Sequence, residues 1–271
     1  SWERTHTANV RPFYYSQVRV HPRNPDRVWW SSTPVMVSND GGKTARTASQ
    51  GIHVDHHAMW IDPSDPDHMI LGNDGGIAIT HDGGGSYDFA ATLPLAQPYE
   101  VSFDFAVPYN ICGGMQDNGS WCGPSRRKQG PVTNAYWFTF NGGDGFYTAQ
   151  HPQDPNIIFG ESQGGNMARY NVATGERTQL VKPTWRPRYL QYEDSILVER
   201  GDTTRPASRE QERRLAELRS RHRTDSAELD IRWNWNTPFF LSPHNPDVFY
   251  TAGNRVMKST QRGDHLFPIS P

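Results

Sequence analysis

The side chains in this sequence that could do chemistry are polar residues set among glycines, and they recur along the chain. Four carboxylates could act as acid, base or nucleophile: Asp74, Asp117, Asp144 and Glu161. Hydrolysis of a glycosidic bond needs two carboxylates facing each other, about 5 to 9.5 Å apart. The same pattern fits a ligand-binding surface, whose candidates are Asp55, His56, His57, Asp74, Gln116, Asp117, Asn118, Asp144, Asn234 and Asn236.

The run Asp55-His56-His57 also contains metal-ligand side chains. Neighbouring residues on a strand point to opposite faces, so His56 and His57 do not readily hold one ion together, whereas Asp55 and His57 could. No phosphate loop, catalytic serine motif or zinc-type cysteine spacing occurs. We therefore expect neither a metal nor a cofactor.

A turn phrase with two prolines organises the chain. It occurs at residues 21–26, 62–67, 151–156 and 242–247, each time before a short apolar run, with a weaker echo at 107–111. When the proline of the echo is counted, the first prolines are 41, 45, 44 and 91 residues apart, and the last interval is close to twice the others. A period in the mid-forties with several short strands per unit is typical of a β-propeller blade.

Two glycine-rich hairpins follow the phrase and carry a pattern of Ser or Thr, then Asp, Gly, and Thr or Ser at alternate positions. The members are Ser38, Asp40, Gly42 and Thr44, then Thr80, Asp82, Gly84 and Ser86. The Asp can accept backbone N–H groups across the turn, and the Gly can adopt positive φ. Near the C-terminus, Gln261 replaces the Asp in a third copy. We expect these Asp residues to be structural.

The sequence therefore predicts an all-β fold, a β-propeller of four-stranded blades in one domain over residues 1–271. About six blade-sized units are expected, at 10–50, 51–95, 96–135, 136–180, 181–236 and 237–271, as part of a larger or incomplete propeller. The glycine-flanked polar residues would line the central channel or its mouth. The alternative is that they are hydrogen-bonded structural groups that hold blades together.

A charged stretch interrupts the fifth unit, with a helical insertion expected at 202–229. Ser208 and Gln211 form a capping-box pattern, and residues 209–222 are expected to be helical. The arginines there are Arg209, Arg213, Arg214, Arg219 and Arg221. This helix is either a solvated decoration or an arm that docks to a partner.

Bulk properties exclude some functions. The net charge is −2, which gives no electrostatic basis for binding nucleic acid, and no apolar run is long enough to span a membrane. Both ends of the sequence look cut, so we expect a piece of a longer protein. Cys112 and Cys122 flank a turn-rich loop and could form a disulfide in an oxidising compartment, or be two unrelated buried thiols.

Over nearly its whole length, apart from the charged stretch, the chain resembles bacterial Asp-box (BNR-repeat) propellers of the sortilin-like group, often labelled glycosyl hydrolases. The resemblance rests on the two hairpins and on segments 11–16, 54–60, 72–76, 114–119, 142–146, 161–166 and 234–238. It implies a periplasmic or extracellular protein. We expect a non-catalytic binding or scaffold module for a protein partner, a larger assembly, a peptide or a carbohydrate. The alternative is a glycoside hydrolase using paired carboxylates.

Overall fold

A computed structural model describes residues 3–9, 11–15, 17–93, 95–183, 195–196, 198–201, 207–229 and 231–270. The chain divides into two compact units, Ser1–Ala96 and Gln97–Pro271, and we describe each by itself. No helix in the described part of the chain is long and apolar enough to cross a membrane.

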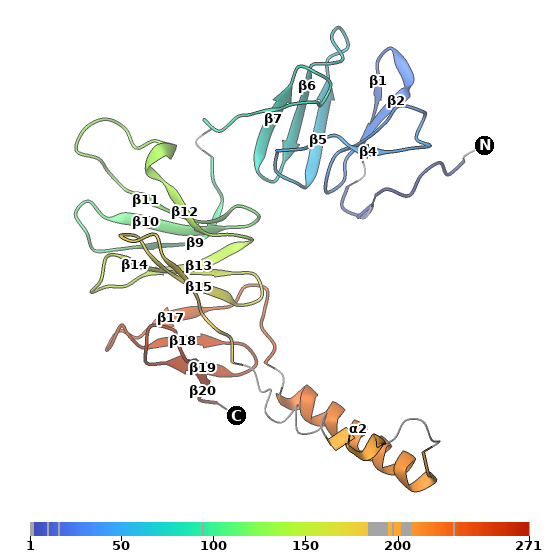
Figure 1. Cartoon of the computed structure of the whole chain (residues 1–271). Coiled ribbons are helices and arrows are strands. Elements are labelled where there is room, and N and C mark those ends of the chain that lie inside the picture. The colour runs from blue at the N-terminus through green and yellow to red at the C-terminus, as the bar shows by residue number, and fades with distance from the viewer. Residues whose placement is uncertain are drawn as a thin grey trace. The chain divides into compact units, whose positions relative to one another are not determined.

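The first unit contains two four-stranded antiparallel sheets, in which each strand pairs with the next along the chain (Figure 1). One sheet consists of β1 (Val18–His21), β2 (Asn24–Trp30), β3 (Met36–Ser38) and β4 (Arg46–Thr47). The other consists of β5 (His56–Ile61), β6 (Met69–Asn73), β7 (Gly76–Thr80) and β8 (Asp88–Phe89). Alternate side chains such as Trp29, Val37, Met59 and Leu71 are buried together between the two sheets.

The second unit contains three more four-stranded sheets with the same consecutive order. They consist of β9 (Pro98–Phe103), β10 (Asn110–Met115), β11 (Gly119–Pro124) and β12 (Phe138–Asn141); β13 (Gly145–Gln150), β14 (Ile157–Ser162), β15 (Asn166–Asn171) and β16 (Arg177–Gln179); and β17 (Phe239–Leu241), β18 (Phe249–Ala252), β19 (Val256–Ser259) and β20 (Phe267–Pro268). A 3-10 turn, Asn134–Tyr136, precedes β12. The largest core cluster of this unit includes Phe159, Met167, Phe239 and Phe249.

The predicted all-β architecture of four-stranded, blade-like sheets is thus confirmed. The described residues form five sheets, against about six expected units. The expected unit at 181–236 contributes no strand among its described residues, and the 202–206 part of the expected insertion lies outside them. The third sheet also extends past its expected end at residue 135, because β12 pairs with β11.

The two-proline phrase does more than separate strands. Its last residue, in each of the four copies, accepts a backbone hydrogen bond from the hairpin between the third and fourth strands of the same sheet. The carbonyl oxygens of Asp26, Asp67 and Asn156 accept from Gly41, Gly83 and Val172 at 2.9, 2.9 and 2.8 Å. In the last sheet, Asp247 accepts from Arg262 at 2.8 Å. The phrase therefore ties two turns together at one end of each of the four sheets that carry it.

Each of the two glycine-rich hairpins closes around its own Asp. Asp82 Oδ1 accepts the N–H groups of Gly85 and Ser86 at 2.8 and 2.9 Å, and Oδ2 accepts the Ser86 hydroxyl at 2.7 Å. The bonds with Thr44 and Ser38 lower the pKa of Asp40, in the first hairpin, to about 2. In the third hairpin, where Gln261 stands, the side chain of Arg262 pairs with Asp247 and Asp154 at 2.6 and 3.1 Å.

Consecutive antiparallel strands place successive connections at alternate ends of a sheet. The two-proline turns and the hairpins occupy one end. The other end carries the second-to-third strand turns and the connections between sheets, and we call it the rim. The first rim comprises residues 31–35, 48–55 and 74–75 of the first unit, together with the segment 11–15, which contacts Asp55. The second rim comprises 116–118, 142–144, 163–165, 231–238 and 253–255 of the second unit, together with the ends of the strands beside them.

Glycines allow the backbones to crowd together at the second rim. A Cβ on Gly114 would overlap the backbone N and O of Phe146 on β13, and one on Gly145 would overlap the carbonyl O of Gly119. Gly142, two residues along from the buried Phe140, has nothing within 4 Å of such a Cβ. The backbones of the third and fourth sheets therefore approach closely beside the polar residues.

Helix α2 (Arg209–Leu229) lies between β16 and β17 in the chain and extends beyond the expected end at residue 222 (Figure 1). The capping box is present, since Gln211 N donates to Ser208 Oγ and Ser208 N donates to Gln211 Oε1, both at 3.2 Å. Leu215 is buried, whereas the five arginines from 209 to 221 are exposed.

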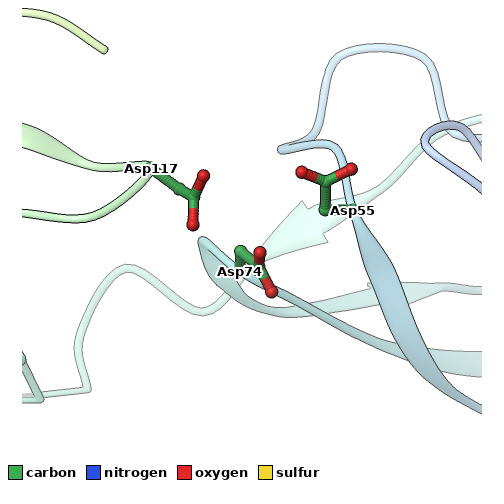
Figure 2. Close-up of side chains that lie close together, drawn as sticks. All are labelled: Asp55, Asp74 and Asp117. Carbon is green, nitrogen blue, oxygen red and sulfur yellow. The ribbon is translucent and has the colours of Figure 1, made fainter. Parts of the chain in front are cut away.

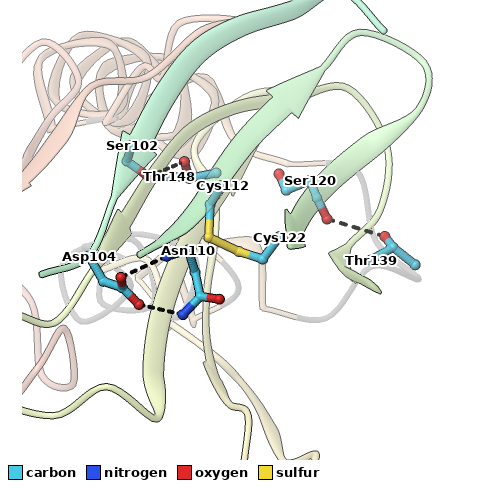
Figure 3. The surroundings of a disulfide bond; sticks show 8 residues. All are labelled: Ser102, Asp104, Asn110, Cys112, Ser120, Cys122, Thr139 and Thr148. Carbon is cyan, nitrogen blue, oxygen red and sulfur yellow. Dashed lines mark hydrogen bonds between the residues drawn. A yellow bond between two sulfur atoms is a disulfide. The ribbon is translucent and has the colours of Figure 1, made fainter. Parts of the chain in front are cut away.

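Cys112 on β10 and Cys122 on β11 are directly opposite each other in the antiparallel register, and both are buried. Figure 3 draws the bond between their sulfur atoms, within a polar shell that includes Ser102 and Thr148, whose hydroxyls are 2.7 Å apart. The two cysteines therefore face each other within one sheet, at a distance that allows a disulfide.

Replacing Gly114 by Ala should lower the free energy of unfolding by more than about 3 kcal/mol, because the new methyl group meets backbone atoms that cannot move separately. Chemical denaturation measures this. Gly142→Ala, on the same rim in open space, is the matched control and should change stability by less than about 0.5 kcal/mol. Equal effects of the two substitutions would contradict the close approach.

The cysteine pair should leave no thiol that reacts with a maleimide in the unfolded, unreduced protein. The double variant Cys112→Ser, Cys122→Ser should lose about 2 to 3 kcal/mol of stability, the effect expected for a loop closed over 10 residues of separation. Mass spectrometry after labelling and a denaturation curve test both points. Two labelled thiols in the unreduced protein would show that the bond does not form.

Candidate functional site

The first rim brings together residues from three separate segments. Asp55 immediately precedes β5, Asp74 lies in the turn after β6, and their carboxylate oxygens are within 4.8 Å of each other. Figure 2 shows Asp55 and Asp74 at the ends of their strands. It also draws Asp117, which belongs to the second unit. Asp55 has a φ of 62°, and its O accepts the N–H of Asp74. The turn and the strand start are thereby joined.

Each of the two carboxylates has a protein partner. The Tyr15 hydroxyl donates to Asp55 Oδ1, and Arg11 Nη1 lies 3.9 Å from the same oxygen. His57 Nε2 lies 3.2 Å from Asp74 Oδ1. The segment 11–15 thus closes over the carboxylates that the sequence singled out.

Aromatic rings cover this polar network. The Arg11 guanidinium lies 4.6 Å from the centre of the Tyr14 ring, and Tyr14 meets His57 edge-on with ring centres 4.8 Å apart. Tyr14 is 43% exposed. The arrangement combines an accessible aromatic face with hydrogen-bonding groups, which suits contact with a ligand.

His56 behaves differently from its neighbour, as strand alternation predicts. Its side chain is fully buried, and neither ring nitrogen has a hydrogen-bond partner among the described residues. Burial lowers the pKa of His56 to about 4, so the ring is neutral at pH 7. His56 is therefore a core residue of the first unit and does not contact a ligand at the surface.

The second rim is a chain of hydrogen bonds between loops of successive sheets. Asp144 Oδ1 accepts the N–H of Asp117 at 2.8 Å, and the Asp144 N–H donates to Gln163 Oε1 at 2.7 Å. The next link runs from Gly164 N to the carbonyl O of Trp235 at 2.9 Å. Asp144 is buried, so its carboxylate serves the backbone of a neighbouring loop.

Glu161, near the end of β14, is 0% exposed. Its Oε1 accepts the N–H groups of Gly165 and Thr237 at 3.3 and 3.2 Å, while Oε2 has no hydrogen-bond partner among the described residues. Burial raises the pKa of Glu161 to about 8, against the opposing effects of those two N–H groups and of the Lys182 charge. A carboxyl sealed from solvent in this way cannot reach a substrate.

The accessible part of the second rim is mainly amide and aromatic, with Arg232 as an exposed charge on the same segment. Asn234 and Asn236 are exposed, and Trp235 between them is 60% exposed. Gln116 is exposed and accepts the Tyr99 hydroxyl, while Asn118 Nδ2 donates to the Gln116 carbonyl O at 3.0 Å. These amides and rings can form hydrogen bonds and apolar contacts with a ligand.

The arginines of α2 are largely paired within their own helical segment. Arg213 lies 2.8 Å from Glu210, Arg214 lies 3.4 Å from Glu210, and Arg221 lies 2.9 Å from Glu217. Arg209 and Arg219 form no ion pair with the described residues. The helix therefore presents less unpaired positive charge than its arginine count suggests.

Several residues of the two rims were not among the sequence candidates. Arg11, Tyr14 and Tyr15 appeared only as part of a family-like segment, and their concentration of aromatic and basic side chains was the available signal. Trp235 likewise lies in one of those segments, and its place between two candidate asparagines was the signal there. The candidates are brought together within each rim, and the predicted lining of a channel stays a prediction.

No family model and no curated protein sequence matches the chain. Among solved structures, it is similar to a GH74 xyloglucanase from Xanthomonas campestris, with 12% identity, 94% of this chain and 38% of that chain covered, and a TM-score of 0.33. It is also similar to YCF48 bound to D1 peptide, with 10% identity, 90% and 64% covered, and a TM-score of 0.35. A third similar structure is an auxiliary nutrient binding protein from Bacteroides thetaiotaomicron, with 11% identity, 94% of this chain and 41% of that chain covered, and a TM-score of 0.29. The chain spans less than two thirds of each of these proteins, and similarities this weak carry no functional argument.

The buried, neutral His56 should make stability fall in acid. Its folded pKa is about 4, below the unfolded value of 6.5, so its contribution is fully present above pH 6.5 and is lost as pH falls through 4. Between pH 7 and 4.5, His56→Phe should lose about 2 to 3 kcal/mol less stability than the wild type. Denaturation curves at both pH values measure this.

The exposed His244 provides the matched control, because His244→Gln should follow the wild type over the same range. An unchanged pH dependence in His56→Phe would show that His56 does not titrate as a buried group.

Proposed function

We propose that this chain is a non-catalytic β-propeller module that binds a protein partner or a larger assembly through its rim loops. One observation carries the proposal: the buried carboxylates of the second rim, Asp144 and Glu161, accept backbone N–H groups of neighbouring loops. These groups hold the rim in shape, and exposed aromatic and amide side chains remain to contact a partner.

The accessible groups are suited to protein contacts. Tyr14 on the first rim and Trp235 on the second are exposed rings beside hydrogen-bonding side chains. Tyrosine and tryptophan held on rigid loops give large contact areas at a low entropic cost, and they dominate many interfaces. Arg209 and Arg219 of α2 are further docking candidates, and so are Arg213, Arg214 and Arg221 where a partner displaces their intrahelical pairs.

The proposal also covers the family of propellers to which the chain belongs and its cellular location. The two Asp-centred hairpins and their internal hydrogen bonds support membership of the Asp-box, sortilin-like propellers. The facing pair of buried cysteines supports a periplasmic or extracellular location, because disulfides persist in oxidising compartments.

A glycoside hydrolase is the second candidate, and the Asp55–Asp74 pair is the observation that favours it. The two carboxylates are close enough for paired chemistry, with oxygens within 4.8 Å. Both are, however, engaged by Tyr15, Arg11 and His57, and the other two sequence candidates in that role, Asp144 and Glu161, are buried. The geometry therefore supports binding better than hydrolysis.

The test is to identify a partner by crosslinking in the native source and then to measure its affinity for rim variants. Tyr14→Ala and Trp235→Ala should each weaken binding at least tenfold if the rim contributing that ring is in contact. Phe240→Ala, which removes an exposed ring from β17, is the matched control and should leave the affinity unchanged.

Hydrolysis is tested in parallel on a panel of polysaccharides. No turnover is expected from the wild-type protein. Turnover that is abolished by Asp74→Asn or Asp55→Asn, in variants that remain folded, would replace the binding proposal with the hydrolase. The binding proposal would also be contradicted if the partner bound both rim variants and the control with the same affinity.

A further inference from the structure

We propose that Glu161 is a proton-dependent clamp that fixes the 231–238 segment of the second rim against the β14–β15 turn and thereby sets the position of Trp235. The clamp concerns the protein alone; only its use in presenting Trp235 to a partner rests on the proposed function.

The clamp is visible in the hydrogen bonds around one oxygen. Glu161 Oε1 joins two segments, because it accepts from Gly165 in the β14–β15 turn and from Thr237 just before β17. Gly164 N donates to the Trp235 carbonyl O at 2.9 Å, and Thr237 Oγ1 donates to the Asn234 carbonyl O at 2.8 Å. Trp235 is therefore fixed through the backbone on both sides while its ring stays exposed.

Close packing limits how the segment can move while the clamp is closed. Gly165 has a φ of 74°, and a Cβ there would lie 2.7 Å from the Trp233 ring. The Lys182 ammonium lies 5.8 Å from the centre of that ring and donates to the Gly164 carbonyl O at 2.6 Å. The turn, the lysine and the segment thus form one packed group around the carboxyl.

The charged groups near Glu161 are few. Lys182 acts on it by its charge, and burial lowers the pKa of Lys182 itself. Arg232, on the clamped segment, is exposed, and Arg169 on β15 pairs with Asp264 at 3.0 Å. Lys182 is therefore the single described cation that favours the ionised form of Glu161.

The relative stability of the neutral and ionised forms of Glu161 decides how the clamp responds to pH. Ionisation would strengthen the bonds to Oε1, but it would also leave Oε2 charged and without a donor in a buried site. Burial outweighs these favourable contacts and raises the pKa of Glu161 to about 8 in the folded protein. In an opened segment the carboxyl meets water and has an ordinary pKa, near 4.5. The clamp is therefore tightest below pH 4.5 and loosens progressively as pH rises to about 8.

Hydrogen exchange at the Gly165 and Thr237 amides tests the clamp without a ligand. The readout is the protection of peptides 161–166 and 231–238 in the wild type relative to Glu161→Gln at the same pH, so that intrinsic exchange rates cancel. Because Glu161→Gln stays neutral, the ratio should fall about tenfold per pH unit between pH 5 and 8 and then level off. Glu161→Ala, which removes the acceptor, should lower the protection of the Gly165 and Thr237 amides at every pH.

Glu176→Gln alters an exposed glutamate on the same unit and should match the wild type throughout. A pH-independent ratio for Glu161→Gln would overturn the clamp. If that variant does not fold, the wild-type rim peptides are compared with β11, after correction for intrinsic exchange. Protection of the rim peptides should fall relative to β11 from pH 5 to 8, and a parallel response would overturn the proposal. Loss of partner binding by Trp235→Ala is a separate result that bears on the proposed function alone.

Discussion

Backbone N–H groups in the loops between sheets need acceptors, and the rims of this protein depend on how that need is met. Loops that cross from one sheet to the next cannot use the ladder bonds of either sheet. Here Asp144 accepts from Asp117, and Glu161 accepts from Gly165 and Thr237. The same side chains that resemble a catalytic set are therefore the groups that join successive sheets of the second unit.

The two ends of the sheets serve different physical purposes. At one end, the two-proline turn is bonded to the hairpin of the same sheet in the four sheets that carry the phrase, and Arg262 also pairs with Asp154 of the preceding sheet. At the rim, the bonds run between sheets, and glycines such as Gly114 and Gly145 let the backbones approach closely. Exposed rings and amides are supported by this rigid base, which favours recognition over chemistry.

Much of the fold could be predicted from the sequence because its signals are local. The period of the two-proline phrase indicated four-stranded units, and Ser208 with Gln211 indicated where α2 begins. The count of units could not be predicted in the same way. The long interval before the last phrase suggested an interrupted blade, but the described residues of the expected unit at 181–236 hold α2 and no strand. The pairing of β12 with β11 is decided by contacts across a long loop, which spacing does not reveal.

The site was predictable in composition but not in role. Nothing in the sequence shows that Tyr15 reaches Asp55, 40 residues away, or that Glu161 is sealed from solvent. Whether the rim carboxylates serve the backbone or a substrate is decided most directly by a carbon-13 NMR titration of the Glu161 carboxyl. A midpoint near pH 8 is expected for the buried acceptor. A midpoint near 4.5 would mean that the group is open to water, and would contradict the structural role assigned to it here.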